Sequence, residues 1–434
     1  MVSVHYLDDM IRAQNRCETR GIVSICSANP FVIEASIQHA LRVDSPVLIE
    51  STCNQVNQFG GYTGLTPEQF VAYVEAIAEK LDFPRERLLL GGDHLGPYPW
   101  RAEPLQLAMQ KSQELVQDYV QAGYVKIHLD ASMKCADDNP ERPLHKSAAA
   151  KRAATMASVA EQTYQEMGGL GTAPRYVIGT EVPVPGGIED SNEQLKVTTV
   201  QDVKEMIEIT GNEFVKQGLE SAWERVVAVV VQPGVDYGDE SILSYDRGKA
   251  AELSSFIENY PNLVYEAHST DYQTLQALKE LVEDHFGILK VGPALTFAFR
   301  EAVFALAMME DELLTGERAK DRSNLRAVLE EAMIENPTHW QNYYAGDDDD
   351  QKFARKYSFS DRSRYYWPDT KVKASLQTLL KNIGSCPLPA SMVSQFLPMQ
   401  YERIISGELI CTPHHIIMDK ICSVLDGYSD AAYG

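Results

Sequence analysis

The residues best suited to chemistry follow a buried-looking apolar run. Leu88, Leu89 and Leu90 are followed by two glycines and then by Asp93 and His94. Such a run is typical of a parallel strand that carries polar groups at its C-terminal end. In such a pair the carboxylate could transfer protons and the imidazole could bind a metal. The alternative is a helix start that Asp93 caps.

A second run places three ionisable side chains on one face of a strand. Lys126, His128 and Asp130 alternate with apolar residues, so they share a face. Unpaired, each would cost several kcal/mol to bury, so they must meet partners, water or a metal. An internal salt-bridge network is the alternative to a site.

Two further runs end in possible metal ligands. One ends at Glu181, before a Pro/Gly-rich loop, and another places Glu266 and His268 on one face. Together with His94, the residues Glu181 and His268 suit a divalent metal, with His128 as a further candidate. Imidazole nitrogen favours zinc among such metals. A hydrogen-bonded core histidine is the alternative for His268.

Other strand ends offer groups for a substrate. Glu50 and Asp130 are further catalytic candidates, and His128 and Ser132 are candidate substrate contacts. The amide-rich loop that begins at Asn54 and Gln55 could bind sugar hydroxyls or bond to itself. Lys290 ends the last run, and a helix N-terminus near Thr296 could hold a phosphate. Near the C-terminus, guanidinium groups and aromatic rings fit a phosphate, a partner surface or helix packing: Arg362, Arg364, Tyr365, Tyr366 and Trp367.

Eight short apolar runs alternate with helical patterns, which predicts an α/β fold, a (β/α)8 TIM barrel with a C-terminal helical extension. Thr66 and Gln69 form a capping-box pattern before the helix expected at 67–81, and further helices are expected at 108–122, 146–167 and 270–286. The runs span 21–27, 46–52, 88–93, 125–130, 176–181, 226–232, 263–268 and 287–292. In this fold the active site lies at the C-terminal strand ends.

We expect a barrel over residues 1–300 and a helical extension packed on it over 301–434. Helical patterns fill the extension at 300–314, 324–333, 371–383 and 391–405. The acidic run 347–350 is expected to be a solvated loop, because four adjacent carboxylates do not by themselves converge on one ion.

Composition excludes several classes of partner. A net charge of −23 argues against nucleic acid and anionic membranes. No apolar run approaches the roughly 18 residues of a membrane span, and the charged first twenty residues lack a signal-peptide core. Seven scattered cysteines without a C-x-x-C pair indicate reduced thiols. We therefore expect a cytoplasmic protein, and its acidic surface and extension are compatible with a homo-oligomer.

Long motifs resemble the Z subunits of class II D-tagatose-1,6-bisphosphate aldolase, and the resemblance covers essentially the whole chain. The motifs are Asn54-Gln55-Val56-Asn57-Gln58-Phe59-Gly60-Gly61, Gly91-Gly92-Asp93-His94-Leu95-Gly96-Pro97, Lys126-Ile127-His128-Leu129-Asp130-Ala131-Ser132, Gly179-Thr180-Glu181-Val182-Pro183, Glu266-Ala267-His268-Ser269-Thr270-Asp271 and Tyr365-Tyr366-Trp367-Pro368.

The resemblance implies a role in galactitol or N-acetylgalactosamine catabolism, in tagatose 6-phosphate degradation. The implied partner is a zinc-dependent catalytic Y subunit, whose activity and stability the Z subunit supports, and the implied substrate is a phosphorylated ketose. Z subunits have also been labelled tagatose-6-phosphate kinases, but the sequence lacks the phosphate-cradling G-x-x-x-x-G-K-[ST] loop.

The resemblance also suggests roles for residues. Asp93 is similar to the aldolase aspartate that moves protons, and His94 to the neighbouring zinc ligand. By the same likeness Glu181 would lie near the metal and His268 would be a further ligand, while Asp130 to Ser132 would lie near a substrate phosphate. Two hypotheses follow: a subunit that assists the aldolase, or a metal-dependent ketose aldolase or C4-epimerase in its own right.

Overall fold

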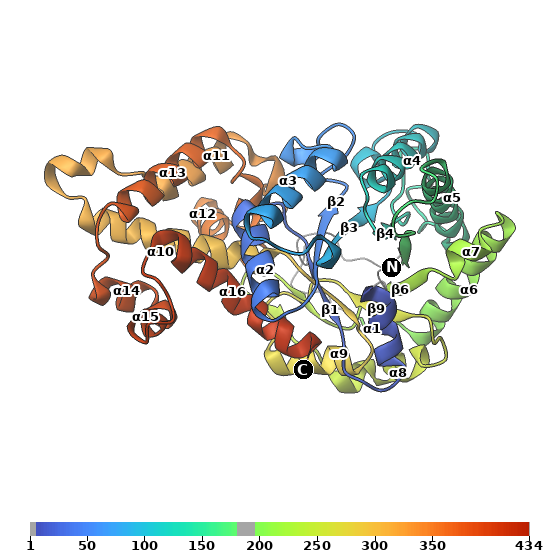
Figure 1. Ribbon diagram of the computed structural model, residues 1–434. Coiled ribbons are helices and arrows are strands. Elements are labelled where there is room, and N and C mark those ends of the chain that lie inside the picture. Colours follow the sequence, from blue (N-terminus) through green and yellow to red (C-terminus); the bar gives the residue numbers. More distant parts are fainter. Residues whose placement is uncertain (1–5, 180–195, 434) are drawn as a thin grey trace.

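The chain forms a closed barrel of eight parallel strands, as the sequence predicts (Figure 1). The computed structural model describes residues 6–179 and 196–433. In order around the barrel, the strands are β1 (Ile22–Ile25), β2 (Val47–Thr52), β3 (Leu88–Leu95), β4 (Lys126–Leu129), β5 (Arg175–Ile178), β6 (Val226–Val231), β9 (Val264–Ala267) and β10 (Ile288–Val291). After β6, a separate antiparallel pair consists of β7 (Asp236–Tyr237) and β8 (Ile242–Leu243).

Helices between the strands cover the outside of the barrel. The capping box of Thr66 and Gln69 is present at the start of α3, as predicted. The helix expected at 270–286 begins later, at Leu275, because Thr274 caps it. The helices are α2 (Pro30–Arg42), α3 (Pro67–Lys80), α4 (Leu105–Gln121), α5 (Lys146–Glu166), α6 (Val200–Lys216), α7 (Glu220–Trp223), α8 (Arg247–Ile257) and α9 (Leu275–Glu283).

The first helix, α1 (Tyr6–Gln14), closes the end of the barrel where the strands begin. Leu7, Met10 and Ile11 of α1 are buried in an apolar cluster with residues from the strand starts, among them Leu48 and Leu89. Each such side chain removed from water stabilises the fold by about 1.5–3 kcal/mol. A polar functional site is therefore expected at the opposite end of the barrel, where the strands finish.

The C-terminal region is helical, as expected, with two local differences. Asp347 caps a helix whose first turn contains Asp348, Asp349 and Asp350, so the prediction of a loop there is wrong. The pattern at 391–405 is two helices, because Pro398 disfavours a helical Leu397. The helices are α10 (Pro293–Leu313), α11 (Leu325–Glu335), α12 (Asp348–Tyr357), α13 (Thr370–Gly384), α14 (Ala390–Phe396), α15 (Pro398–Ile405) and α16 (Pro413–Ala432).

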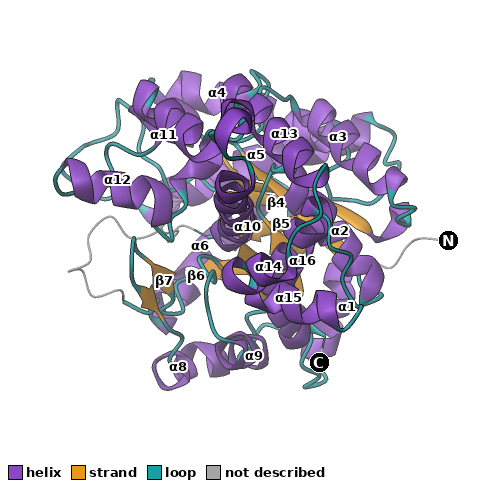
Figure 2. Cartoon of the chain, turned by 90° about the vertical axis from the view of Figure 1, so that its left-hand side faces the viewer, coloured by secondary structure: helices purple, strands orange, loops and turns teal. Residues whose placement is uncertain are grey.

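Short 3-10 turns complete the described elements. They are η1 (Gly61–Thr63), η2 (Arg85–Arg87), η3 (Tyr98–Trp100), η4 (Gly316–Asp321), η5 (Pro337–His339) and η6 (Arg362–Tyr365). Figure 2 views the molecule from the side of the extension, where α11, α12 and α13 lie on one side of α10 and α14 and α15 on the other.

The last helix, α16, belongs to the ring around the barrel. It packs between α9 and α2, beside β1, and the amide of Gly21 donates to the carbonyl of Ala432 at 2.8 Å (Figure 1). Helix α10 begins at the end of β10 and runs unbroken past residue 300. The C-terminal helix thus occupies the place of an eighth outer helix, and the division at residue 300 stays a prediction.

No described helix is long and apolar enough to cross a membrane. All seven cysteines are free in the structure.

Candidate metal and substrate site

An irregularity in β3 brings two neighbouring side chains to the mouth of the barrel. The register between β3 and β4 shifts between Gly92 and Leu95, and His94 adopts a positive φ of 49°. In a regular strand Asp93 and His94 would point to opposite faces. The bulge redirects them so that both line one cavity, as bulges near active sites commonly do.

The strand end is held close to β4 by a glycine. A Cβ atom on Gly96 would lie 1.7 Å from the carbonyl oxygen of Asp130, so any other residue would push the two strand ends apart. This approach keeps Asp130 within reach of His94.

Three histidines at the mouth are each paired with a carboxylate. His94 Nδ1 lies 2.9 Å from Asp130 Oδ2, and His128 Nδ1 lies 3.0 Å from Asp93 Oδ1. His268 Nε2 lies 2.9 Å from Glu266 Oε1. The Nδ1 of His128 also accepts from the His94 amide at 3.2 Å. Each ring therefore has one nitrogen beside a carboxylate and a second nitrogen outside that contact. Metal-binding histidines usually show this arrangement.

The cluster of these histidines with Asp93 fits a divalent metal. Ligand atoms of Asp93, His94, His128 and His268 all lie within 4.8 Å of one another. The buried Nε2 of His128 has no hydrogen-bond partner among the described residues, and such an atom is costly unless it binds something. Three imidazoles with a further position open are a known catalytic arrangement for zinc.

Charges around the site fix its protonation. Burial alone would raise the pKa of Asp93, but His94, Lys290 and His128 hold that pKa well below its usual range. Burial and the nearby Lys290 lower the pKa of His268 to about 3, so this ring is neutral and able to bind a metal. Burial would lower the pKa of His94, yet Asp93 and Asp130 raise it overall.

Beneath the histidines lies a layer of four buried charges. Lys126 Nζ contacts Glu50 Oε1 at 2.6 Å and Glu266 Oε2 at 2.7 Å. Lys290 Nζ lies 3.1 Å from Glu50 Oε2 and also pairs with Asp93. The salt-bridge alternative thus holds for Lys126, whereas His128 and Asp130 are buried beside Asp93 and His94 and do not line the mouth cavity themselves. A Cβ atom on Gly91 would come within 2.7 Å of Glu50, so this glycine makes room for the carboxylate.

The mouth holds a cavity of about 110 Å³ whose lining comes from strand ends and from the extension. Asp93, His94, His268 and Lys290 line one part. Residues from the amide-rich loop and the C-terminal region line another: Asn54, Gln55, Tyr62, Arg364 and Tyr365. The extension therefore contributes to the candidate site as well as to the ring of helices.

The remaining predicted residues occupy different places. Gln55 Oε1 accepts from the Thr52 amide, so the loop partly bonds to itself while still facing the cavity. Ser132 donates to Asp130 Oδ1 at 2.6 Å. Thr296 donates to the Pro293 carbonyl within α10. Glu181 lies outside the described residues.

Two expected phosphate contacts lie away from the cavity. Arg362 is buried over the ring of Tyr343, 3.1 Å from its centroid, and donates to the His339 carbonyl. Thr296 is also buried and absent from the lining. Their roles as substrate ligands stay predictions.

Sequence reasoning did not select several lining residues as site residues. They are Cys26, Tyr237, Ser269 and Asp271, of which Ser269 and Asp271 belong to a quoted motif but were given no role in the site. Position alone could have signalled them, because every residue just after a barrel strand lies near the mouth. Burial raises the pKa of Asp271 to about 6, while two α10 amides oppose that rise.

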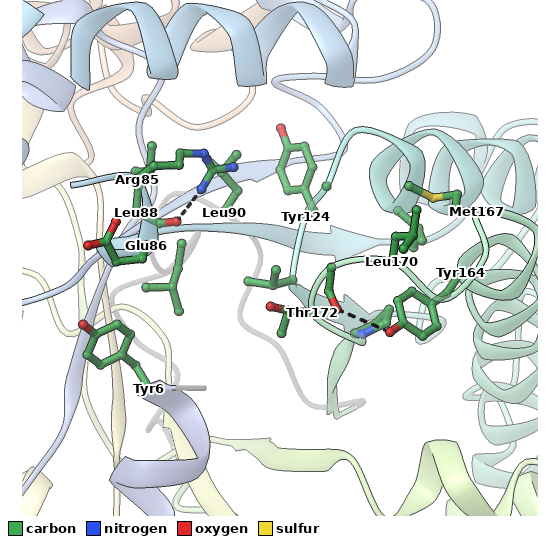
Figure 3. A pocket seen from close by; sticks show the side chains of 16 residues that line it. Tyr6, Arg85, Glu86, Leu88, Leu90, Tyr124, Tyr164, Met167, Leu170 and Thr172 are labelled. Atoms are coloured by element: carbon green, nitrogen blue, oxygen red, sulfur yellow. Dashed lines mark hydrogen bonds between the residues drawn. The ribbon is translucent and has the colours of Figure 1, made fainter. Parts of the chain in front are cut away.

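A larger cavity of about 310 Å³ lies at the opposite end of the barrel (Figure 3). It is lined by residues from the starts of β3 and β4 and from neighbouring loops, including Tyr6, Leu88, Leu90 and Tyr164. Its dashed contacts in Figure 3 are structural: Arg85 donates to the Leu88 carbonyl and Tyr164 to the Gly171 carbonyl. The histidine cluster is absent from this cavity, so we place the chemistry at the mouth.

Fold and site together define a (β/α)8-barrel protein with a candidate divalent-metal site. Residues 7–433 match the model of the family described as D-tagatose-1,6-bisphosphate aldolase subunit GatZ/KbaZ-like, so the chain belongs to that family. This confirms the resemblance inferred from the motifs. Membership in a family of aldolase subunits implies a partner subunit.

The chain is similar to a solved structure from Sinorhizobium meliloti 1021 named a probable tagatose 6 phosphate kinase. The two are 43% identical with a TM-score of 0.86, over 95% of this chain and 100% of that one. The YdjI aldolase from Escherichia coli K12 is 12% identical with a TM-score of 0.42, over 88% of this chain and 96% of that one. A fructose-bisphosphate aldolase from Campylobacter jejuni is 16% identical with a TM-score of 0.43, over 88% and 92%. At these last values neither likeness bears on the reaction.

Proposed function

We propose that this chain is a component of D-tagatose-1,6-bisphosphate aldolase that supports the activity and stability of a catalytic Y subunit, and that it carries a metal site of its own. Zinc is the favoured metal because the candidate ligands are imidazoles. The observation that carries the second part is the set of three histidines, each with one nitrogen beside a carboxylate.

The same observation favours a second candidate function. A subunit that only supports its partner would gain nothing from burying three imidazole–carboxylate pairs, since such groups are costly to bury. The alternative is an independent ketose aldolase or C4-epimerase that acts on a phosphorylated ketose.

In that reaction His94, His128 and His268 would hold the metal. When bound, the metal would polarise the ketose carbonyl and make the 4-hydroxyl more acidic. Asp93 would then accept the proton from the 4-hydroxyl. Contact with Lys290 lowers the basicity of Asp93, so the hydroxyl must be acidified for this transfer to succeed.

Turnover with and without a partner tests the proposal. We expect the purified Y subunit to cleave tagatose 1,6-bisphosphate faster and to survive heating longer when this chain is added. The chain alone should then be assayed on the bisphosphate and on fructose 6-phosphate. Turnover by the chain alone establishes the second function; no change in the Y subunit on addition contradicts the first.

Metal content is a separate prediction. Metal-free protein should bind about one zinc ion, and replacing His128 with Ala should weaken binding at least tenfold. Because the raised pKa of His94 makes protons compete with the metal, affinity should fall about tenfold per pH unit once the pH drops below that pKa. Titration against a chelator between pH 5.5 and 8 measures both effects.

The exposed His145, which caps α5, is the matched control. His145→Ala should leave zinc affinity unchanged. Equal zinc binding by wild type and His128→Ala would exclude the histidine cluster as the site.

A further inference from the structure

The segment of residues 358–367, here called the mouth segment, connects α12 to α13 and covers part of the barrel mouth. The Phe359 amide donates to the Asp239 carbonyl at 2.9 Å, and Tyr272 donates to the Phe359 carbonyl at 2.6 Å. A buried ion pair between Arg300 and Asp361, 3.2 Å apart, fixes the segment to α10. The mouth segment is therefore held by the loops that follow β6 and β9 and by α10.

This anchoring presents one guanidinium to the cavity. Arg364 donates to the carbonyls of Ser360 and Asp361 and, at 2.9 Å, to the hydroxyl of Tyr365. It makes no direct ion pair with a carboxylate of residues 6–179 or 196–433, since Asp361 is paired with Arg300. Burial raises the pKa values of both Asp361 and Asp271, and the charge of Arg364 nevertheless acts to lower them. A guanidinium that is withdrawn from bulk water and has no direct carboxylate partner is a ready site for an anion.

The other cation of the cavity is already neutralised. Lys290 contacts Asp93 and Glu50, and a third carboxylate, that of Glu266, lies 3.6 Å away. Among the described lining residues, Arg364 is thus the cation left to a ligand. The segment 180–195 contains no Lys or Arg in its sequence.

The usual phosphate position of such barrels is occupied by the protein. The amides of Gly292 and Ala294, at the start of α10, donate to Asp271 Oδ1 at 3.0 and 2.8 Å. A phosphate at the end of the last strand would need these amides. The Asp271 carboxylate therefore closes that position, and an anion must bind elsewhere in the mouth.

Aromatic side chains make the surroundings of Arg364 rigid. The rings of Tyr62 and Tyr365 meet edge to face at 4.9 Å, and His339 stacks on Tyr365 at 4.6 Å. Arg364 lies over the Tyr365 ring, 4.5 Å from its centroid. Tyr62 follows β2, so these contacts join the extension to the barrel beside the cavity.

We propose that Arg364, with Tyr365 and Tyr62, forms the subsite that binds the anionic end of the sugar substrate. The subsite rests on the proposed function, because it assigns one end of that substrate to the extension. The shared chemistry is a terminal oxyanion, either the phosphate of a sugar phosphate or the carboxylate of a sugar acid.

Direct binding tests the subsite without depending on turnover. Inorganic phosphate and tagatose 6-phosphate should bind the full chain in calorimetry, and Arg364→Gln should weaken both roughly tenfold to hundredfold. Unphosphorylated tagatose should bind wild type and variant equally. Galacturonate carries a carboxylate in place of a phosphate, and its affinity compared with that of tagatose 6-phosphate shows which oxyanion the subsite prefers. Arg12→Gln removes an exposed charge on α1 and should change nothing.

Arg364→Gln loses the hydrogen bonds to the backbone carbonyls and could fail to fold, so two further variants are needed. Arg364→Lys keeps the charge and should recover part of the phosphate affinity, and Tyr365→Phe keeps the ring and should weaken phosphate binding a few-fold. Phosphate binding that is unchanged in folded Arg364→Gln overturns the subsite; where that variant does not fold, unchanged binding in Tyr365→Phe does so. Binding through Arg364 without any turnover or effect on the Y subunit overturns the proposed function and leaves the subsite standing.

Discussion

Asp93→Asn is expected to abolish turnover by this chain, with a loss of about 10²–10⁴ in kcat if Asp93 accepts the substrate proton. Asparagine has nearly the same shape and keeps a polar group that can hydrogen-bond to His128 Nδ1, 3.0 Å from Asp93 Oδ1 in the structure. It cannot accept a proton from a hydroxyl. We therefore expect the rate to fall while zinc remains bound, as measured by steady-state kinetics and metal analysis on the same preparation.

Asp130→Asn is the matched comparison. Asp130 holds His94 at 2.9 Å and also accepts from Ser132, so it orients a candidate ligand without lying in the cavity lining. Its replacement should weaken metal binding about 10–100-fold, and excess zinc should restore the rate. If zinc also restores the rate of Asp93→Asn, then Asp93 acts by orienting His128 and not by accepting a proton.

The barrel could be predicted from the sequence because the apolar runs that form its strands are easy to recognise. Eight apolar runs separated by helical patterns leave few arrangements, and the observed strands lie within the predicted runs or extend them by one or two residues. What periodicity could not reveal was α16. Its apolar side chains, such as Ile417 and Ile421, read as those of any buried helix, and only long-range packing places it between α9 and α2.

The site was predictable in outline and not in its pairings. Alternation along β4 correctly grouped Lys126, His128 and Asp130, but it could not assign Lys126 to the charge layer and His128 to the histidine cluster. Alternation also predicts opposite faces for Asp93 and His94. The bulge at His94 depends on the close approach of Gly96 to Asp130, a contact between two strands that sequence spacing does not encode.

Arginine 362 and its neighbour two residues on illustrate a second limit. Both lie just before the aromatic run of Tyr365, Tyr366 and Trp367, so composition cannot distinguish them. In η6, Arg362 lies over Tyr343 and Arg364 lines the cavity. Which guanidinium faces the barrel is decided by the Arg300–Asp361 pair and the aromatic contacts of the mouth segment.

The largest loss of stability is expected from Lys126→Met. Lys126 is fully buried between Glu50 and Glu266, at 2.6 and 2.7 Å, and both carboxylates are also fully buried. Methionine fills similar space but leaves two anions with Lys290 as their shared cation. Removing one partner from a buried ion pair costs about 3–5 kcal/mol. Chemical denaturation should show that decrease in the free energy of unfolding.

Two variants separate lost charge pairing from lost packing. Lys111→Met breaks a partly exposed pair with Glu103 and should cost no more than about 1 kcal/mol. Adding Glu266→Gln to Lys126→Met removes one of the uncompensated anions and should recover part of the stability, although it also alters the partner of His268. If the double variant is no more stable than Lys126→Met, uncompensated charge is not the cause, and the layer beneath the histidines is stabilised by packing instead.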